Sequence, residues 1–263
     1  MQKIVLFDMD GTLTPAREHL DYNLVPSLIK LCNHADIGIV SGSDFDYIMQ
    51  QCGFLTKKRE IKLKLHLLPC NGTKYCPPPK YLDSDYLVKV QKDMKRQIGS
   101  TNFSKIMKIL IDYQNHIVSH YNIPLSGHFI SYRESMINWC PIGRNADLVE
   151  RESFCQFDKS FGTSSFRRTV LQQLRQEFEV AKIPVTIKLG GVTSFDIYPD
   201  GWDKTYSLNH FPDSEIYFLG DRCGDNGNDK ELYDVLQPKN SFWVKDTKDT
   251  KRIIEEVLIP RIK

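Results

Sequence analysis

The chain has 263 residues, of which 41% are hydrophobic, so it can bury one large core or a core plus an inserted second one. The 35 Lys and Arg and the 33 Asp and Glu leave a formal net charge of +2 without a dense basic stretch, which argues against nucleic acid as a partner. No apolar run approaches the ~18 residues that cross a bilayer, and the first residues lack a secretion signal. The seven cysteines are scattered without a C-x-x-C pair, so we expect a cytoplasmic protein with reduced thiols and no membrane contact.

The first elements along the chain predict a βαβ unit. An apolar run over Ile4 to Phe7 predicts a buried strand, helical spacing follows over residues 24–31, and a second apolar run covers Ile37 to Val40. Continuous apolar strands flanked by helices are typical of a parallel sheet that is covered on both faces. Ligands bind such sheets at the carboxyl ends of the strands, and Asp8 and Ser41 both stand at such ends.

The middle of the chain has a different pattern. Helical stretches are predicted over Tyr86 to Ile98 and over Ile106 to Ile117, and the strands that follow lack βαβ spacing. We interpret residues 85–199 as an inserted α+β cap domain. Residues 1–84 and 200–263 then form an α/β core with a parallel sheet.

A second acidic strand end follows the inserted segment. The apolar run Ile216 to Leu219 predicts a strand that leads into a loop beginning with Asp221. A carboxylate such as Asp8 can attack phosphorus if a hard cation neutralises the charge and a second acid, here Asp10, moves a proton. Mg²⁺ suits this role, and Asp221 can supply the remaining carboxylate. Donors for the transferred phosphoryl group would be Ser41, Ser43 and Lys204.

Four segments occur in an order that resembles the haloacid dehalogenase superfamily of phosphotransferases: "FDMDGT", "VSGSD", a downstream Lys and "GDRCGDNGND". At closer range, "FDMDGTLTPAR", "YRESMINWCPIGR" and "SFDIYPDGWDK" are similar to eukaryotic-type phosphomannomutases. The resemblance implies a haloacid-dehalogenase-like Rossmannoid core with an inserted cap. It also implies interconversion of mannose 6-phosphate and mannose 1-phosphate through a phosphoaspartate and a hexose 1,6-bisphosphate, within GDP-mannose biosynthesis.

The resemblance also implies roles for single residues. Asp8 would be the nucleophile and Asp10 the general acid and base. Mg²⁺ would be bound by the side chain of Asp8, the main-chain carbonyl of Asp10, and Asp221. The residues expected to bind the sugar phosphate are Arg17, Arg133, Arg144, Arg151, Ser194 and Asp196. A homodimer formed through the cap domains is expected as well.

A hairpin in the cap can be derived from the residues alone. If residues 134–135 form a two-residue turn, Tyr132 pairs with Ile137 and one face of the hairpin is apolar. The opposite face then carries side chains that can hold an anion: Ser131, Arg133 and Asn138. Along the later strand, Ser194 and Asp196 point to the same side because they are two residues apart.

Ser41 departs from the family pattern and keeps a second function open. Phosphomannomutases usually have Gly-Gly-Ser-Asp where this chain has Ser41-Gly42-Ser43-Asp44, and the added hydroxyl is typical of the phosphatases of the superfamily. A sugar-phosphate phosphatase that uses the same residues is therefore the alternative to a mutase. A sugar-phosphate-binding protein without catalysis is less consistent with the sequence, because a binding protein needs no nucleophile. The preference for mannose or glucose stays open.

Overall fold

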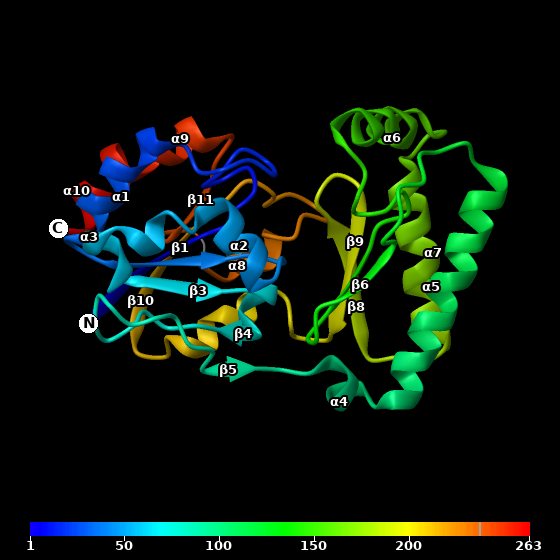
Figure 1. Ribbon diagram of the computed structural model, residues 1–263, viewed down its shortest axis with the longest axis horizontal. Helices are drawn as coiled ribbons and strands as arrows, with labels where there is room; N and C mark the ends of the chain where they lie inside the picture. The colour runs from blue at the N-terminus through cyan, green and yellow to red at the C-terminus, as the bar shows by residue number, and fades with distance from the viewer. Residues whose placement is uncertain (237) are drawn as a thin grey trace. The chain divides into compact units, whose positions relative to one another are not determined.

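The computed structural model describes residues 1–236 and 238–263 (Figure 1). The chain divides into two compact units, residues 1–91 with 202–263, and residues 92–201. The predicted boundaries fall after residues 84 and 199, whereas the units divide after residues 91 and 201. The first boundary lies later than predicted because strand β5 (Val90–Gln91) pairs with β4 (Lys74–Tyr75) of the first unit.

The predicted helix over Tyr86 to Ile98 is wrong in its first half. Strand β5 occupies part of this stretch, and helix α4 (Met94–Ile98) begins only after Asp93, whose side chain accepts a hydrogen bond from the main-chain N–H of Arg96. A helix starts where a side chain caps its first free N–H groups, so Asp93 sets this start.

The first unit is built on a five-stranded parallel sheet. Its strands in spatial order are β11 (Ser241–Trp243), β10 (Ser214–Gly220), β1 (Gln2–Phe7), β2 (Asp36–Val40) and β3 (Leu65–Leu68). Both faces of β1 are buried, because Val5 and Phe7 join one hydrophobic cluster while Ile4 and Leu6 join another. This burial confirms the parallel sheet that the continuous apolar runs predict.

Helices cover both faces of this sheet. Helix α1 lies with the C-terminal helices α9 and α10 on the face of Val5 and Phe7, and α8 contributes Leu232 to the opposite cluster (Figure 1). The α-helices of the unit are α1 (Val25–Cys32), α2 (Phe45–Cys52), α3 (Arg59–Lys62), α8 (Lys230–Leu236), α9 (Thr247–Arg252) and α10 (Ile259–Ile262). Its other helical turns are η1 (Tyr22–Leu24), η2 (Leu55–Lys57), η3 (Cys70–Gly72), η4 (Lys204–His210) and the π-helical η5 (Ile253–Leu258).

The second unit contains a four-stranded antiparallel sheet. Its strands in spatial order are β6 (Ile130–Tyr132), β7 (Ile137–Trp139), β9 (Ser194–Pro199) and β8 (Val185–Gly190). Its helices are α4, α5 (Ser100–His120), α6 (Leu148–Ser160) and α7 (Phe166–Val180), of which α5 and α7 cover one face of the sheet (Figure 1). The apolar stripe of α7 is buried, as its spacing of four predicts: Phe166, Val170, Leu174 and Phe178.

The strand order brings the polar strand ends of the first unit to one edge. Asp8 follows β1, Ser41 follows β2 and Asp221 follows β10, and these three strands are neighbours. The predicted α/β core with an inserted α+β domain is confirmed by these two sheets. Within residues 1–236 and 238–263, no helix combines the length and the hydrophobicity that a membrane span requires.

Candidate active site

Three charged side chains meet in the interior at the carboxyl end of β1. The ammonium of Lys204 donates to the carboxylates of Asp8 and Asp229, in the second case at 2.5 Å. Lys204 is 1% exposed and Asp229 is fully buried. A buried charge is tolerated when it is paired and hydrogen-bonded, and Lys204 satisfies two carboxylates at once.

A third carboxylate completes this acidic cluster. Asp8, Asp221 and Asp229 each place a carboxylate oxygen within 4.8 Å of the others. The sheet register explains the proximity, because Phe7 pairs with Leu219 and the main-chain N–H of Asp8 donates to the Leu219 carbonyl at 2.9 Å. The two chain segments therefore leave adjacent strands side by side, as parallel strands require.

The cluster holds more negative charge than Lys204 neutralises. Burial and the charge of Asp229 raise the pKa of Asp8 well above its usual value, although Lys204 acts against this shift. Burial and Asp229 also raise the pKa of Asp221. Burial lowers the pKa of Lys204, but Asp229 and Asp8 outweigh this effect and leave it above its usual range. Additional positive charge would therefore stabilise the site.

Asp8 and Asp221 fit a divalent cation. Oδ1 of Asp221 is buried and accepts no hydrogen bond from any residue that the structure describes. Asp229, in contrast, has both oxygens engaged, by Lys204 and by the main-chain N–H of Arg222 at 2.9 Å. An all-oxygen donor set suits a hard cation such as Mg²⁺. The identity of the ion and the contribution of the Asp10 carbonyl stay predictions.

Gly11 keeps space open beside Asp221. Its φ is +92°, and a Cβ at this position would lie 2.4 Å from Oδ2 of Asp221. Any other residue would be strained in this backbone conformation and would collide with the carboxylate. The glycine of "DMDGT" thus allows the loops after β1 and β10 to approach each other.

Asp10 is held through one of its oxygens. Oδ1 accepts a hydrogen bond from the main-chain N–H of Arg17 at 2.8 Å, and the hydroxyl of Tyr47 lies 3.4 Å away. A carboxylate that is fixed through one oxygen can use the other to move a proton. The main chain of Arg17 therefore contacts Asp10, a contact that the sequence does not predict. Substrate binding by the side chain of Arg17 stays a prediction.

The loop after β2 contains the two predicted serines. Ser41 is buried, and its Oγ accepts a hydrogen bond from the main-chain N–H of Ser43 at 3.1 Å. Asp44 then caps α2 by accepting from the N–H of Phe45. The hydroxyl of Ser41 therefore shapes the loop that presents Ser43.

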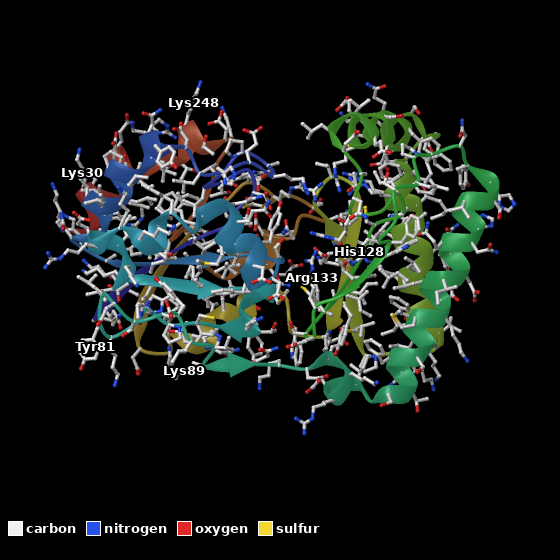
Figure 2. All side chains as sticks on the ribbon, viewed as in Figure 1. Lys30, Tyr81, Lys89, His128, Arg133 and Lys248 are labelled. Carbon is white, nitrogen blue, oxygen red and sulfur yellow. The ribbon has the colours of Figure 1, made fainter. Side chains whose placement is uncertain are left out.

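In the second unit, the hairpin has the predicted register. Tyr132 pairs with Ile137 and Ser131 with Asn138, across a turn that Arg133 and Met136 close with a main-chain hydrogen bond of 2.8 Å. Glu134 has a φ of +61° whereas the φ of Ser135 is not positive, so this turn is not of type I′, which needs positive φ at both central residues. Figure 2 shows Arg133 on the side of the sheet away from α5 and α7.

A row of polar side chains crosses this side of the sheet. Asn138 donates from Nδ2 to Asp196 at 2.7 Å, and Arg144 donates from Nη1 to Oδ1 of Asn138 at 3.0 Å. In the strand register, Asp196 of β9 pairs with Asn138 of β7 and with Lys188 of β8. Ser194 shares the face of Asp196, and its hydroxyl donates to the Gly190 carbonyl. This row can bind an anion and hydroxyl groups.

Arg151 is buried and holds neighbouring backbone in place. Its guanidinium donates to the carbonyls of Ala146 and Arg144, at 2.9 and 3.0 Å, and to the hydroxyl of Thr193 at 2.7 Å. It lies in the first turn of α6, which begins with a capping box formed by Asp147. These contacts connect the segment of Arg144 with the turn before β9, while substrate binding by Arg151 stays a prediction.

One residue of the site escapes the sequence analysis. Asp229 is not among the predicted residues, although the second acidic residue of "GDNGND" could have suggested it. Asn138 is expected on the anion-binding face of the hairpin, but its contacts with Asp196 and Arg144 emerge only from the structure. The structure joins Asp8, Lys204 and Asp221 in the first unit, and it joins Arg144 and Asp196 through Asn138 in the second.

Comparisons with known proteins agree on one family. A family model described as eukaryotic phosphomannomutase matches residues 24–260. Phosphomannomutase 1 of Dictyostelium discoideum is 33% identical over 258 residues, which cover 97% of this chain and 96% of that protein. The phosphomannomutase of Arabidopsis thaliana is 34% identical over 236 residues, which cover 88% of this chain and 87% of that protein.

Solved structures share the fold at low identity. An IMP-bound mutant of the IMP-nucleotidase of Plasmodium falciparum has a TM-score of 0.69 at 14% identity, covering 98% of this chain and 68% of that one. The trehalose-6-phosphate phosphatase of Aspergillus fumigatus has a TM-score of 0.53 at 16% identity, covering 100% of this chain and 93% of that one. These are phosphatases with the haloacid dehalogenase fold, which confirms the predicted core.

Replacing Lys204 by methionine tests its part in the cluster. Lys204→Met removes the ammonium and leaves two buried carboxylates unpaired, so we expect the free energy of unfolding to fall by about 3–5 kcal/mol. Urea unfolding of the chain in the presence of a chelator measures this change. Lys230→Met is the control, because Lys230 pairs with Asp234 on the surface and should matter little. Equal effects of both substitutions would contradict the role given to Lys204.

Proposed function

The chain belongs to the eukaryotic phosphomannomutase family, and we propose from this membership that it interconverts mannose 6-phosphate and mannose 1-phosphate. The proposed path runs through phospho-Asp8 and a hexose 1,6-bisphosphate, and glucose phosphates are possible further substrates. The observation that supports it best is the cluster of Asp8, Lys204 and Asp221 at the carboxyl edge of the parallel sheet. Such a cluster suits an activated carboxylate nucleophile.

In the proposed reaction, Asp8 and Asp10 divide the chemistry. A hydroxyl of the sugar phosphate attacks the phosphorus of phospho-Asp8, Asp10 takes the proton of this hydroxyl, and the bond from Asp8 to phosphorus breaks. After the bisphosphate has turned around, Asp8 attacks the other phosphate and Asp10 returns the proton to the departing sugar oxygen. Bound Mg²⁺ would neutralise the phosphoryl oxygens and the Asp8 carboxylate.

Lys204 and the serine loop orient these groups. The ammonium of Lys204 holds Asp8 from one side, because it is itself fixed by the buried Asp229. Ser43 would donate to an oxygen of the transferred phosphoryl group, and Ser41 supports it through the loop hydrogen bond. These roles extend the family relation to single residues of this chain.

The polar row of the second unit would bind the phosphate that is not being transferred. An arginine fork reads phosphate bidentately, and a carboxylate accepts hydrogen bonds from sugar hydroxyls. We assign these roles to Arg144 and Asp196, together with the other predicted ligands: Arg17, Arg133, Arg151 and Ser194. The homodimer, the cytoplasmic location and a place in GDP-mannose biosynthesis are proposed from family membership alone.

A phosphatase is the second candidate, and Ser41 is the residue that favours it. Its hydroxyl lies at the end of β2, next to the strand that leads to Asp8, where it could help to place a water. Hydrolysis needs no polar row for a second phosphate, whereas the mutase reaction does. The row that includes Asn138 and Asp196 therefore supports the mutase.

Substitution of the nucleophile tests the covalent path. Asp8→Asn should lower turnover by at least about a thousandfold, because it removes the attacking oxygen charge with little change in volume. Product formation and the yield of labelled phosphoenzyme are the measurements. Asp46→Asn, at an exposed position in the first turn of α2, is the matched control and should keep both. Substantial turnover without Asp8 would exclude phospho-Asp8 as the intermediate.

Substitution in the polar row tests whether this row binds the phosphate that is not transferred. Arg144→Ala should raise KM for mannose 1-phosphate by about tenfold or more, and raise KM for para-nitrophenyl phosphate much less, because the latter has no second anchoring group. Arg168→Ala, an exposed residue of α7, is the control. Equal losses on both substrates would mean that Arg144 only supports the fold.

Product analysis decides between mutase and phosphatase. Mannose 1-phosphate is supplied with Mg²⁺ and a trace of hexose 1,6-bisphosphate, and mannose 6-phosphate and free phosphate are followed together. We expect isomerisation to be at least about ten times faster than phosphate release, a barrier difference of about 1.4 kcal/mol. Stoichiometric phosphate without mannose 6-phosphate would identify a phosphatase, and Ser41→Gly would then test the role of that hydroxyl. If neither mannose 6-phosphate nor free phosphate forms, the result would point to a binding protein.

A further inference from the structure

Trp243 makes a specific hydrogen bond although 55% of its surface is exposed. It is the last residue of β11 and pairs with Gly220 in the parallel register. Its indole Nε1–H donates to the main-chain carbonyl of Asp221 at 2.8 Å. Burial alone does not explain a tryptophan here, because more than half of the side chain faces solvent. The acceptor of this hydrogen bond is Asp221, one of the two residues that fit a divalent cation.

The peptide between Asp221 and Arg222 is held from both ends. Its carbonyl accepts from Trp243, and its N–H donates to Oδ2 of Asp229 at 2.9 Å. A peptide unit is planar, so these two hydrogen bonds fix its rotation. The fixed peptide restricts the directions in which the Asp221 side chain can leave the backbone. Asp229 is in turn anchored by Lys204.

The indole ring also contacts the loop that follows Asp221. A Cβ at Gly224 would lie 3.1 Å from Cη2 of Trp243, so the ring rests close to the loop backbone. Tyr233 of α8 meets the ring edge-on, with 6.3 Å between the ring centres. The loop closes on itself through a hydrogen bond from the N–H of Gly227 to the Gly224 carbonyl. Trp243 thus connects the sheet with this loop.

We propose that Trp243 is a positioning residue for the cation site, because its indole N–H aims Asp221 toward Asp8. Among the described residues, none donates a hydrogen bond to Oδ1 of Asp221, and Nε of Arg222 lies 3.7 Å from Oδ2, beyond hydrogen-bond distance. The clamped peptide is therefore the constraint that we assign to this carboxylate. The inference rests on the proposed function, which assigns Asp8 and Asp221 to Mg²⁺. Outer hydrogen bonds to metal ligands change metal affinity by about 10–100-fold.

Calorimetric titration of the full chain with magnesium chloride tests this proposal. Two variants are compared with the natural chain, Trp243→Phe and a variant carrying 3-benzothienylalanine at position 243. The second keeps the bicyclic shape and lacks only the N–H donor. We expect the Kd for Mg²⁺ to rise at least about tenfold in both variants. The increase in Tm at a fixed Mg²⁺ concentration should shrink accordingly, because binding to the folded state stabilises it by mass action.

Trp139→Phe is the matched control. The indole of Trp139 also makes a 2.8 Å hydrogen bond, to Gln114 in the second unit, and its loss should leave the Kd for Mg²⁺ unchanged. A Kd within twofold of the natural chain in both Trp243 variants would overturn the proposal, as would a Tm lowered equally with and without Mg²⁺. If the natural chain itself binds no Mg²⁺, the proposed cation site is wrong. This outcome is seen before any substitution is made, so it is distinguishable from a failure of the Trp243 proposal alone.

Discussion

The ion pair of Lys204 with Asp8 and Asp229 is the constraint on which the rest of the site depends. These three residues come from distant parts of the chain, and none of them could be buried alone, because an unpaired charge in the interior costs several kcal/mol. Strand β1, the turn η4 and the loop after β10 must therefore meet at one point. Pairing of these three charges therefore links the proposed catalytic groups to the packing of the fold.

Negative charge remains in excess after this pairing. Asp221 adds a third carboxylate, and its Oδ1 receives no hydrogen bond from the described residues. Gly11 allows the close approach of this carboxylate, and the peptide that carries it is fixed by Trp243 and Asp229. A site that is organised by its backbone in this way would need little rearrangement to bind the proposed cation and phosphate.

In the second unit, the buried core and the polar row proposed to bind the substrate lie on opposite faces of one sheet. In β9, the buried Phe195 stacks on Trp139, whose indole donates to Gln114 of α5, while Ser194 and Asp196 belong to the polar row. Successive residues of a strand alternate between faces, so a shift of one residue would exchange the two sets. The register that buries the core thereby also sets the positions of Asn138 and Asp196.

The sequence by itself determined the acidic strand ends, the hairpin register and the apolar stripe of α7, because each follows from local alternation or helical spacing. Tertiary structure alone decided that residues 90–91 form a strand, since β5 exists only by pairing with β4. It also decided the partners of Arg151 and the inclusion of Asp229. These features depend on contacts between residues far apart in the chain, and periodicity within a short window carries no information about such contacts.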